Sequence, residues 1–406
     1  MRNNPELRSA RQDEFIHLGK SHYNKKDMFP KIATYGTHDS QPAGDTDGDT
    51  TTGGTGGAAS GDSHDRNWRK AFGVSAEWTV FAWGETRWKS RMELRESESD
   101  KWNSSAKEAD TIYDVTEAYW RVVFFQAVVQ LRKDALHARR KEVQSVGERV
   151  SAREARRADL LLAQAQVAEA EQEVLKAENG LELSKERLLI VVGRGYGESV
   201  NVRDHLSVTK SQLPAEVDLE THPEVKRIRA AQEAALAAER SARAGRKPKL
   251  IFRGHIEDST PQESAGSSNL VPEGVNYQLG AYVTLPAGQQ WVGATGRLRE
   301  ALASQAQLAA DAEALSNSLR LRIKDAQNQV EETRMGIEVA RMNERAAAES
   351  LKVQRELASI RNATRADVAK AENDYTEARI GVLRAIYDHK DAQAHQKREL
   401  GVLFSE

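Results

Sequence analysis

Apolar and polar residues alternate in two short segments of each half of the chain. Between positions 72 and 82 the even positions are Phe, Val, Ala, Trp, Val and Ala, whereas the odd positions from 73 to 79 are Gly, Ser, Glu and Thr. The same alternation recurs around Leu279 and Val283, and in the segment that begins at Leu250. A period of two places alternate side chains on opposite faces of a strand. The pattern therefore predicts two hairpins, each with one apolar face and one polar face.

Long stretches with helical composition follow these strands. Residues 84–150 contain no proline and would form a helix of roughly 100 Å at 1.5 Å per residue. Residues 291–360 are similar. Such helices are stable only when neighbours cover their apolar stripe. The shorter helices after each turn supply a seven-residue repeat with alanine on one seam, which predicts close, supercoiled packing. The seam positions are Ala163, Ala170, Ala177, Ala371, Ala378 and Ala385.

The second half repeats the first at an offset of 218 positions. Six residues are identical at that offset, which favours a duplicated unit. They are Pro5, Glu6, Arg11, Pro30, Lys31 and Gly36, matched by Pro223, Glu224, Arg229, Pro248, Lys249 and Gly254. The unit is a helix, two strands, a long helix, a turn and a shorter helix. The predicted fold class is mainly α with a small β part.

The element bounds follow from these patterns. The first repeat, 1–215, is predicted as a helix over 5–29, strands over 31–37 and 72–83 around a flexible Gly-rich loop over 38–67, a long helix over 84–150, a turn over 151–158, a helix over 159–193 and a connector over 194–215. The second repeat, 216–406, is predicted as a helix over 223–247, strands over 249–257 and 276–287, a long helix over 291–360, a turn over 361–366 and a helix over 367–403.

Two interpretations of the strands remain open, because alternation alone suits a half-buried sheet as well as a lipid-facing barrel wall. The strand length of about 10 residues favours the barrel, as does the absence of any second apolar layer in the sequence. Four strands cannot close a useful barrel, so several chains would have to contribute, since open edges are not tolerated in lipid. The lipid-facing positions are then Val74, Trp78, Val80, Leu279, Val283 and Leu285.

Composition removes several classes of function. The 406 residues are 39% hydrophobic and 30% charged, which suits long solvated helices. A net charge of -2 argues against nucleic-acid binding. The absence of cysteine excludes disulfides and thiolate metal sites. No apolar run is long enough for a membrane helix. No signal peptide precedes Asn4. The second repeat has an approach segment over 213–221 that the first repeat lacks, so we expect Met1 to lie inside the first helix of a longer precursor; the alternative is a cytosolic protein that was always this short.

The sequence contains no recognisable catalytic or cofactor motif. It has no His-Glu-Xaa-Xaa-His, no nucleophile elbow and no dinucleotide fingerprint. The ten histidines are scattered without helical pairing, which argues against a zinc or di-iron site. The Gly-rich loop is not followed by Gly-Lys-Ser/Thr, so a phosphate-binding loop is not predicted. We expect no enzyme, no cofactor and no metal.

This layout resembles the TolC-like outer-membrane efflux protein family. The family's turn pattern is glycine, two residues, Ser/Thr, two residues, Asp-Val/Leu, two residues and Ala. The second copy meets it in Arg361-Asn-Ala-Thr364-Arg-Ala-Asp367-Val368-Ala-Lys370-Ala371, and the first in the segment from Arg153 to Ala163. Arginine replaces the glycine in both copies, the first copy lacks the hydroxyl residue, and Lys370 stands where some members carry an acid.

The resemblance implies a homotrimer whose strands form one twelve-stranded barrel in outer-membrane lipid, continued by a helical tunnel across the periplasm. It also implies a periplasmic mouth at the two helix turns, which docks an adaptor (membrane fusion) protein and an inner-membrane transporter. Glu77 and Arg253 would face the pore, or else pair with each other. The residues predicted for the mouth and its docking surface are Arg153, Arg156, Asp159, Arg361, Thr364, Asp367 and Lys370.

Blander interpretations stay open beside this one. Turns between solvated helices are usually charged, and Asp159 and Asp367 also suit a helix amino terminus through the macrodipole. The chain as a whole could be a structural coiled-coil protein, or the periplasmic adaptor of such a duct. An adaptor should carry a single hairpin flanked by a lipoyl-like module and a β-rich domain. This sequence repeats its hairpin and lacks those two modules. The sequence does not indicate the exported substrate.

Overall fold

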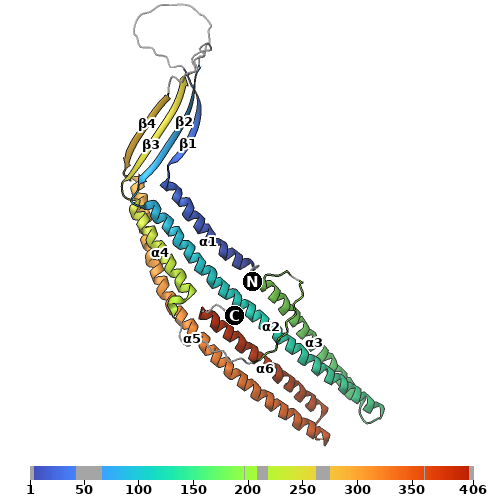
Figure 1. The fold of residues 1–406 in the computed structure, drawn as a ribbon. Coiled ribbons are helices and arrows are strands. Elements are labelled where there is room, and N and C mark those ends of the chain that lie inside the picture. The colour runs from blue at the N-terminus through green and yellow to red at the C-terminus, as the bar shows by residue number, and fades with distance from the viewer. Residues whose placement is uncertain are drawn as a thin grey trace, which may run out of the picture. The chain divides into compact units, whose positions relative to one another are not determined.

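The computed structural model describes residues 4–42, 66–195, 197–207, 218–261, 275–360 and 362–401. Each half of the chain has the same order of elements (Figure 1). The first half comprises α1 (Pro5–Asn24), β1 (Lys31–Pro42), β2 (Arg66–Phe81), α2 (Glu85–Ser151) and α3 (Arg157–Val192). The second half comprises α4 (Pro223–Ala244), β3 (Lys249–Pro261), β4 (Val275–Thr284), α5 (Gln289–Ser359) and α6 (Arg365–Glu399). The predicted fold class, mainly helical with a small sheet, is confirmed.

The first hairpin extends further than the alternation indicated. β1 pairs with β2 from Lys31↔Glu77 to Pro42↔Arg66, so residues 38–42 and 66–67 are strand, although they were assigned to the Gly-rich loop. The reason is that backbone hydrogen bonds continue an antiparallel ladder past the last apolar residue. Positions 43–65, the rest of that predicted loop, lie outside the described residues. The first helix is also shorter than predicted, because residues 25–28 tighten into a 3₁₀ turn before Pro30.

The chain divides into two compact units, each of which takes segments from both halves. The helical unit comprises Met1–Phe15, Ser97–Ala230 and Leu308–Glu406. The sheet unit comprises Ile16–Glu96 and Ala231–Gln307. The units therefore cut across the duplication, because elements of the two halves pack together: β2 pairs with β3, and α2 contacts α6. No helix among the described residues has the length and apolarity needed to cross a lipid bilayer.

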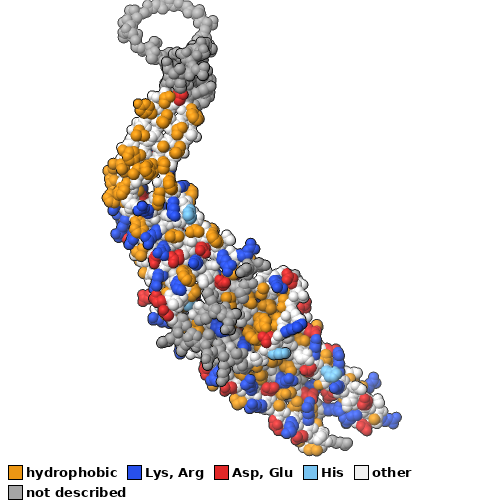
Figure 2. All heavy atoms as spheres, in the orientation of Figure 1, with side chains coloured by type: hydrophobic (Ala, Val, Ile, Leu, Met, Phe, Trp, Pro, Cys, Tyr) orange, Lys and Arg blue, Asp and Glu red, His pale blue; other side chains and the backbone are white. Residues whose placement is uncertain are grey.

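The sheet unit contains one antiparallel sheet in the order β1-β2-β3-β4. Val74 is paired with Ile256 and Trp78 with Phe252, so apolar side chains of neighbouring strands share a face. On the other face, Glu77 lies opposite Arg253. Figure 2 shows apolar side chains gathered over the strands, whereas charged side chains cover much of the helices. Most of these apolar side chains are exposed within the part of the chain that the structure describes.

The helical unit is held together by narrow apolar seams. Ala118 and Val122 of α2 form one cluster with Leu188 of α3. A second cluster joins Val128 and Val129 of α2 to Ala177 of α3, with Ile380 and Leu383 of α6 packed against it. The α2 helix therefore contacts both shorter helices, α3 of its own half and α6 of the other half. Small residues set the spacing, since a Cβ added at Gly180 would lie 2.6 Å from the Phe125 ring.

Candidate functional site

The first helical turn joins α2 to α3 through a residue with left-handed backbone. Arg153 has φ 65°, a conformation that costs a non-glycine residue about 1 kcal/mol. The N–H of Glu154 donates to the carbonyl oxygen of Arg149 at 2.7 Å and closes the turn. Arg153 is the position at which the resembling turn pattern has glycine, so the backbone conformation explains the glycine. The arginine keeps the conformation and bears its steric cost.

Asp159 caps α3 from one side only. Its Oδ2 accepts a hydrogen bond from the backbone N–H of Arg156 at 3.1 Å. The guanidinium of Arg156 has no acceptor atom, so it cannot return a hydrogen bond to the helix N-terminus. The reciprocal arrangement of a capping box is therefore half complete at this turn.

The second turn has the complete arrangement. The Oγ1 of Thr364 accepts from the N–H of Asp367 at 3.2 Å, and Oδ2 of Asp367 accepts from the N–H of Thr364 at 2.9 Å. The Thr364 hydroxyl also donates to the same carboxylate at 2.6 Å, and this bond is the largest cause that lowers the pKa of Asp367. Lys370 is exposed one turn further along α6, and Arg361 lies outside the described residues.

Direct contacts between the two halves of the chain are made by arginines of α2 that precede the first turn in sequence. Arg139 is 6% exposed and binds α6 with its guanidinium. It donates to the carbonyl oxygen of Ala369 at 2.8 Å and to Oδ1 of Asn373 at 3.0 Å, and pairs with Glu372 at 2.9 Å. Three acceptors on one face of α6 thus fix the position of a buried charge, which is stable only when paired in this way.

Arg132 repeats this link seven residues earlier. It contacts Glu377 of α6 at 2.6 Å and Glu173 of α3 at 3.4 Å. The turns were the predicted site, and the arginines on α2 were missed. The available signal was the seven-residue spacing between Arg132 and Arg139, which places both on one stripe of a long helix. We call Arg132 and Arg139 with their partners on α6 the interhelical arginine links.

The predicted alanine seam lies at or near the helix contacts. Ala163, Ala177 and Ala371 are buried, whereas Ala170, Ala378 and Ala385 are half-buried. Because alanine adds little beyond Cβ, these positions let the backbones approach. The seam positions therefore act in packing within the helical unit.

All six positions predicted to face lipid are exposed. They are Val74, Trp78, Val80, Leu279, Val283 and Leu285, and Leu279 reaches 84%. One placement differs from strict alternation, because the register shifts between Thr79 and Phe81. Phe81 lies opposite Leu250, so Val80 sits in the irregularity itself. Leu285 follows the last residue of β4.

The polar face carries the two residues predicted to line a pore. Arg253 Nε lies 2.9 Å from Glu77 Oε2, so the pairing considered as the alternative is present. Both side chains are about half exposed. A second polar group was missed: the Tyr35 hydroxyl donates to Glu257 at 2.8 Å, and the Tyr35 ring is stacked on His255. Gly73 leaves room for it, since an added Cβ would lie 2.6 Å from the Tyr35 ring.

Comparisons with known proteins agree with this architecture. Residues 1–194 match the model of the outer membrane efflux protein family. The structure of CusC superposes with a TM-score of 0.83 at 16% identity, over 98% of this chain and 89% of that one. VceC of Vibrio cholerae gives 0.80 at 17% identity, over 98% and 93%. The open-state MtrE channel of Neisseria gonorrhoeae gives 0.80 at 18% identity, over 98% and 86%. No curated protein sequence matches significantly.

Proposed function

Since residues 1–194 match the model of the outer membrane efflux protein family and the chain has the fold of outer-membrane channels over 98% of its length, we propose that it is a passive exit duct of the outer membrane. Three copies would form the duct, with a barrel in the outer membrane and a helical tunnel in the periplasm. No bond is made or broken in such a role, so no catalytic residue is assigned.

The observation that carries the proposal is the uncovered apolar face of an open sheet. Leu279 and Tyr277 are more than four-fifths exposed, and neighbouring strands continue this apolar face. β1 and β4 are the first and last strands in the sheet order, so each has a neighbour on one side only. A strand edge in lipid must be paired. Pairing β1 of one copy with β4 of the next satisfies the edges and surrounds the apolar face with lipid.

Cysteine cross-linking tests this pairing on a chain that has no cysteine of its own. The variant Ala33→Cys/Gln278→Cys places thiols on the polar faces of β1 and β4. Lys31→Cys and Tyr35→Cys replace the first substitution in turn to scan the register. Oxidation should give covalent dimers and trimers on a non-reducing gel. The matched control, Ala33→Cys/Ser75→Cys, joins Cα partners within one chain and should remain monomeric. If every variant of the scan gives only monomers, the result favours the alternative of a structural coiled-coil protein.

We infer that the helical end of the duct opens when α2 and α6 separate. The interhelical arginine links join these helices, so opening must break them. Arg132→Gln should raise the open probability of single channels in planar bilayers. Lys133→Gln is the control, because Lys133 pairs with Glu178 of α3 in its own half at 2.7 Å and should leave gating unchanged. Equal gating in both variants would contradict a role for these links.

We also propose that the two turns dock a periplasmic adaptor and, through it, an inner-membrane transporter. Arg153, Arg156 and Lys370 offer exposed positive charge beside the two capping aspartates. Asp367→Ala removes one cap and should change both single-channel conductance and pump-dependent export. If conductance and export both stay unchanged, Asp367 acts only in capping α6.

A further inference from the structure

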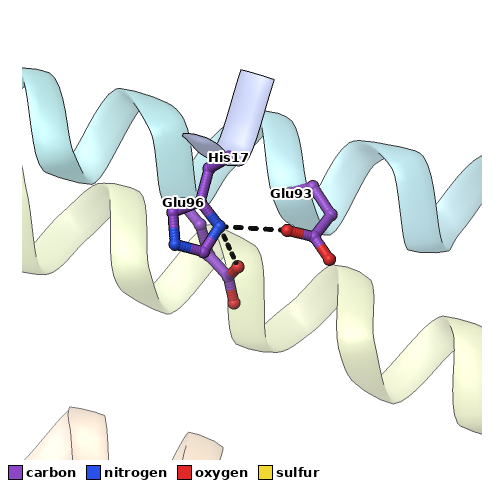
Figure 3. A group of neighbouring side chains, drawn as sticks. All are labelled: His17, Glu93 and Glu96. Carbon is purple, nitrogen blue, oxygen red and sulfur yellow. Dashed lines mark hydrogen bonds and ion pairs between the residues drawn. The ribbon is translucent and has the colours of Figure 1, made fainter. Parts of the chain in front are cut away.

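A histidine and two glutamates meet where α1 lies against α2 in the sheet unit. Figure 3 shows His17 of α1 directed at Glu93 and Glu96 of α2. Its Nδ1 lies 3.0 Å from Oε2 of Glu93 and 3.0 Å from Oε2 of Glu96. The three ligand atoms are all within 4.8 Å of one another. Glu93 is buried, and the other two side chains are half-buried. We call these residues the His17 cluster.

A protonated imidazole alone satisfies this arrangement poorly. The Nδ1 atom carries at most one proton, and that proton can be directed at only one of two carboxylates that lie equally close. Glu93 and Glu96 are also one helical turn apart, so their charges repel.

We propose that the His17 cluster binds a divalent cation of the zinc class, which joins α1 to α2. Imidazole nitrogen with carboxylate oxygen is a donor set that Zn²⁺ accepts. Around a tetrahedral Zn²⁺ with bonds of about 2.1 Å, ligand atoms lie about 3.4 Å apart, close to the 3.0 Å separations seen here. One cation can contact both carboxylates and the imidazole at once. The proposal does not depend on the channel function.

The surroundings suit a bound cation. Asn24 Nδ2 lies 3.5 Å from Oε1 of Glu93, the carboxylate oxygen that faces away from His17. Such outer contacts hold a ligating carboxylate in orientation. Ser21 and Ser90 form another polar contact between the two helices, with their hydroxyl oxygens 3.0 Å apart. The sequence search for a metal site missed the cluster, because its ligands come from segments more than 70 positions apart and follow no local motif.

Zinc binding by the full-length protein in detergent tests the proposal. After chelator treatment and dialysis, isothermal titration with Zn²⁺ gives the stoichiometry and affinity. Glu96→Gln keeps the side-chain shape, and His17→Gln removes the imidazole. Each should weaken Zn²⁺ binding at least about tenfold, since losing even an outer-shell contact has that effect. His395→Gln is the matched control, because His395 faces the single carboxylate of Glu399 at 3.5 Å, and both residues lie on α6, outside the His17 cluster.

The expected result is one Zn²⁺ per chain, bound with unchanged affinity by His395→Gln and at least about tenfold more weakly by both cluster variants. X-ray absorption of the zinc-loaded protein should show one imidazole with oxygen ligands. Far-UV circular dichroism identifies a variant that fails to fold, and Glu96→Gln then decides the outcome. Unchanged affinity in Glu96→Gln, equal weakening in His395→Gln, or no saturable binding to the unmodified protein would each overturn the proposal.

Discussion

The α1 and α4 helices occupy corresponding places in the two halves of the chain, yet their buried faces differ in chemistry. The buried face of α1 includes Ser21, whose hydroxyl donates to the carbonyl oxygen of Ser90 at 3.0 Å. The buried face of α4 consists largely of alanine, and Ala234 and Ala237 are each 3% exposed. The same position in the architecture can therefore be held by directional hydrogen bonds or by close backbone approach. The first tolerates polar chemistry, and the second restricts side-chain volume.

The two helical turns also differ in their stabilising contacts. Thr364 and Asp367 satisfy each other, whereas Arg156 only donates to Asp159. The first turn also holds Arg153 at positive φ. The second-half turn is thus the better formed of the two in local terms. Duplicated elements need not share their stabilising contacts, provided that the backbone path is kept.

The largest effect should come from breaking the contact at which the halves meet. Arg139→Met removes one of the two arginines that pair with Glu372 and leaves the Ala369 carbonyl and Asn373 without their donor, and should lower the free energy of unfolding by about 3 kcal/mol. Chemical denaturation of the detergent-solubilised protein measures it. The control is Arg140→Met, whose exposed pair with Glu171 at 2.7 Å should contribute about 1 kcal/mol or less. Similar losses in both variants would remove the distinction between buried and exposed arginines.

A smaller effect should follow from adding volume to the alanine face of α4. Ala237→Leu forces a larger side chain into a packed site and should cost about 1–3 kcal/mol. Its neighbour Ala238 is half-buried, so Ala238→Leu should cost less. On the polar side of the comparison, Ser21→Ala loses a hydrogen bond without adding volume and should cost about 1 kcal/mol. Denaturation midpoints order the three variants, and an equal cost for Ala237→Leu and Ala238→Leu would contradict close packing.

Exchanging the capping residues should reduce the difference in stability between the N-termini of α3 and α6. Thr364→Ala removes the acceptor for the Asp367 N–H and should destabilise α6 by about 1 kcal/mol. Arg156→Thr supplies the missing acceptor to α3 and should stabilise it by a similar or smaller amount. Thermal unfolding followed by circular dichroism should show shifts of opposite sign. A loss in both variants would mean that Arg156 has another role.

The strained position in the first turn offers a smaller gain. Arg153→Gly relieves the left-handed conformation, worth about 1 kcal/mol, but increases the entropy of the unfolded chain by roughly 0.5 kcal/mol or more. The net stabilisation should be a few tenths of a kcal/mol. Arg149→Gly is the control, because Arg149 lies in the last turn of α2, where its replacement by glycine should lower stability instead. A loss in Arg153→Gly would show that its side chain matters more than its backbone.

Acid should loosen the second turn slightly. Hydrogen bonds from Thr364 lower the pKa of Asp367 in the folded state, so the unfolded chain binds this proton more readily. The stabilisation is present above the unfolded pKa of about 4 and is lost as pH falls through the lower folded value. Amide exchange of residues 365–368, corrected for intrinsic rates, should show less protection at about pH 3 than at pH 6. The Thr364→Ala variant should show a smaller change.

The fold followed from local pattern, whereas much of the site did not. Alternation and helical composition indicated the hairpins and long helices, since both depend on periods read along the chain. The ladder beyond Thr37 and the register shift at Thr79 depend on a partner strand, so alternation could not locate them. Arg139 looked like any solvated arginine until its neighbours on α6 were known. The turns lie between the long and short helices as predicted, because their capping residues are close together in sequence, and their role as a docking site stays a prediction.

The four-stranded sheet also bears on how the protein must be made. Backbone donors and acceptors along an unpaired edge bind other extended chains readily, and an adjoining oily surface increases that tendency. A newly made copy is therefore at risk of pairing with the wrong chain. Correct assembly therefore competes with aggregation. A low concentration of unassembled chains, or a chaperone that covers the strand edges, would favour assembly.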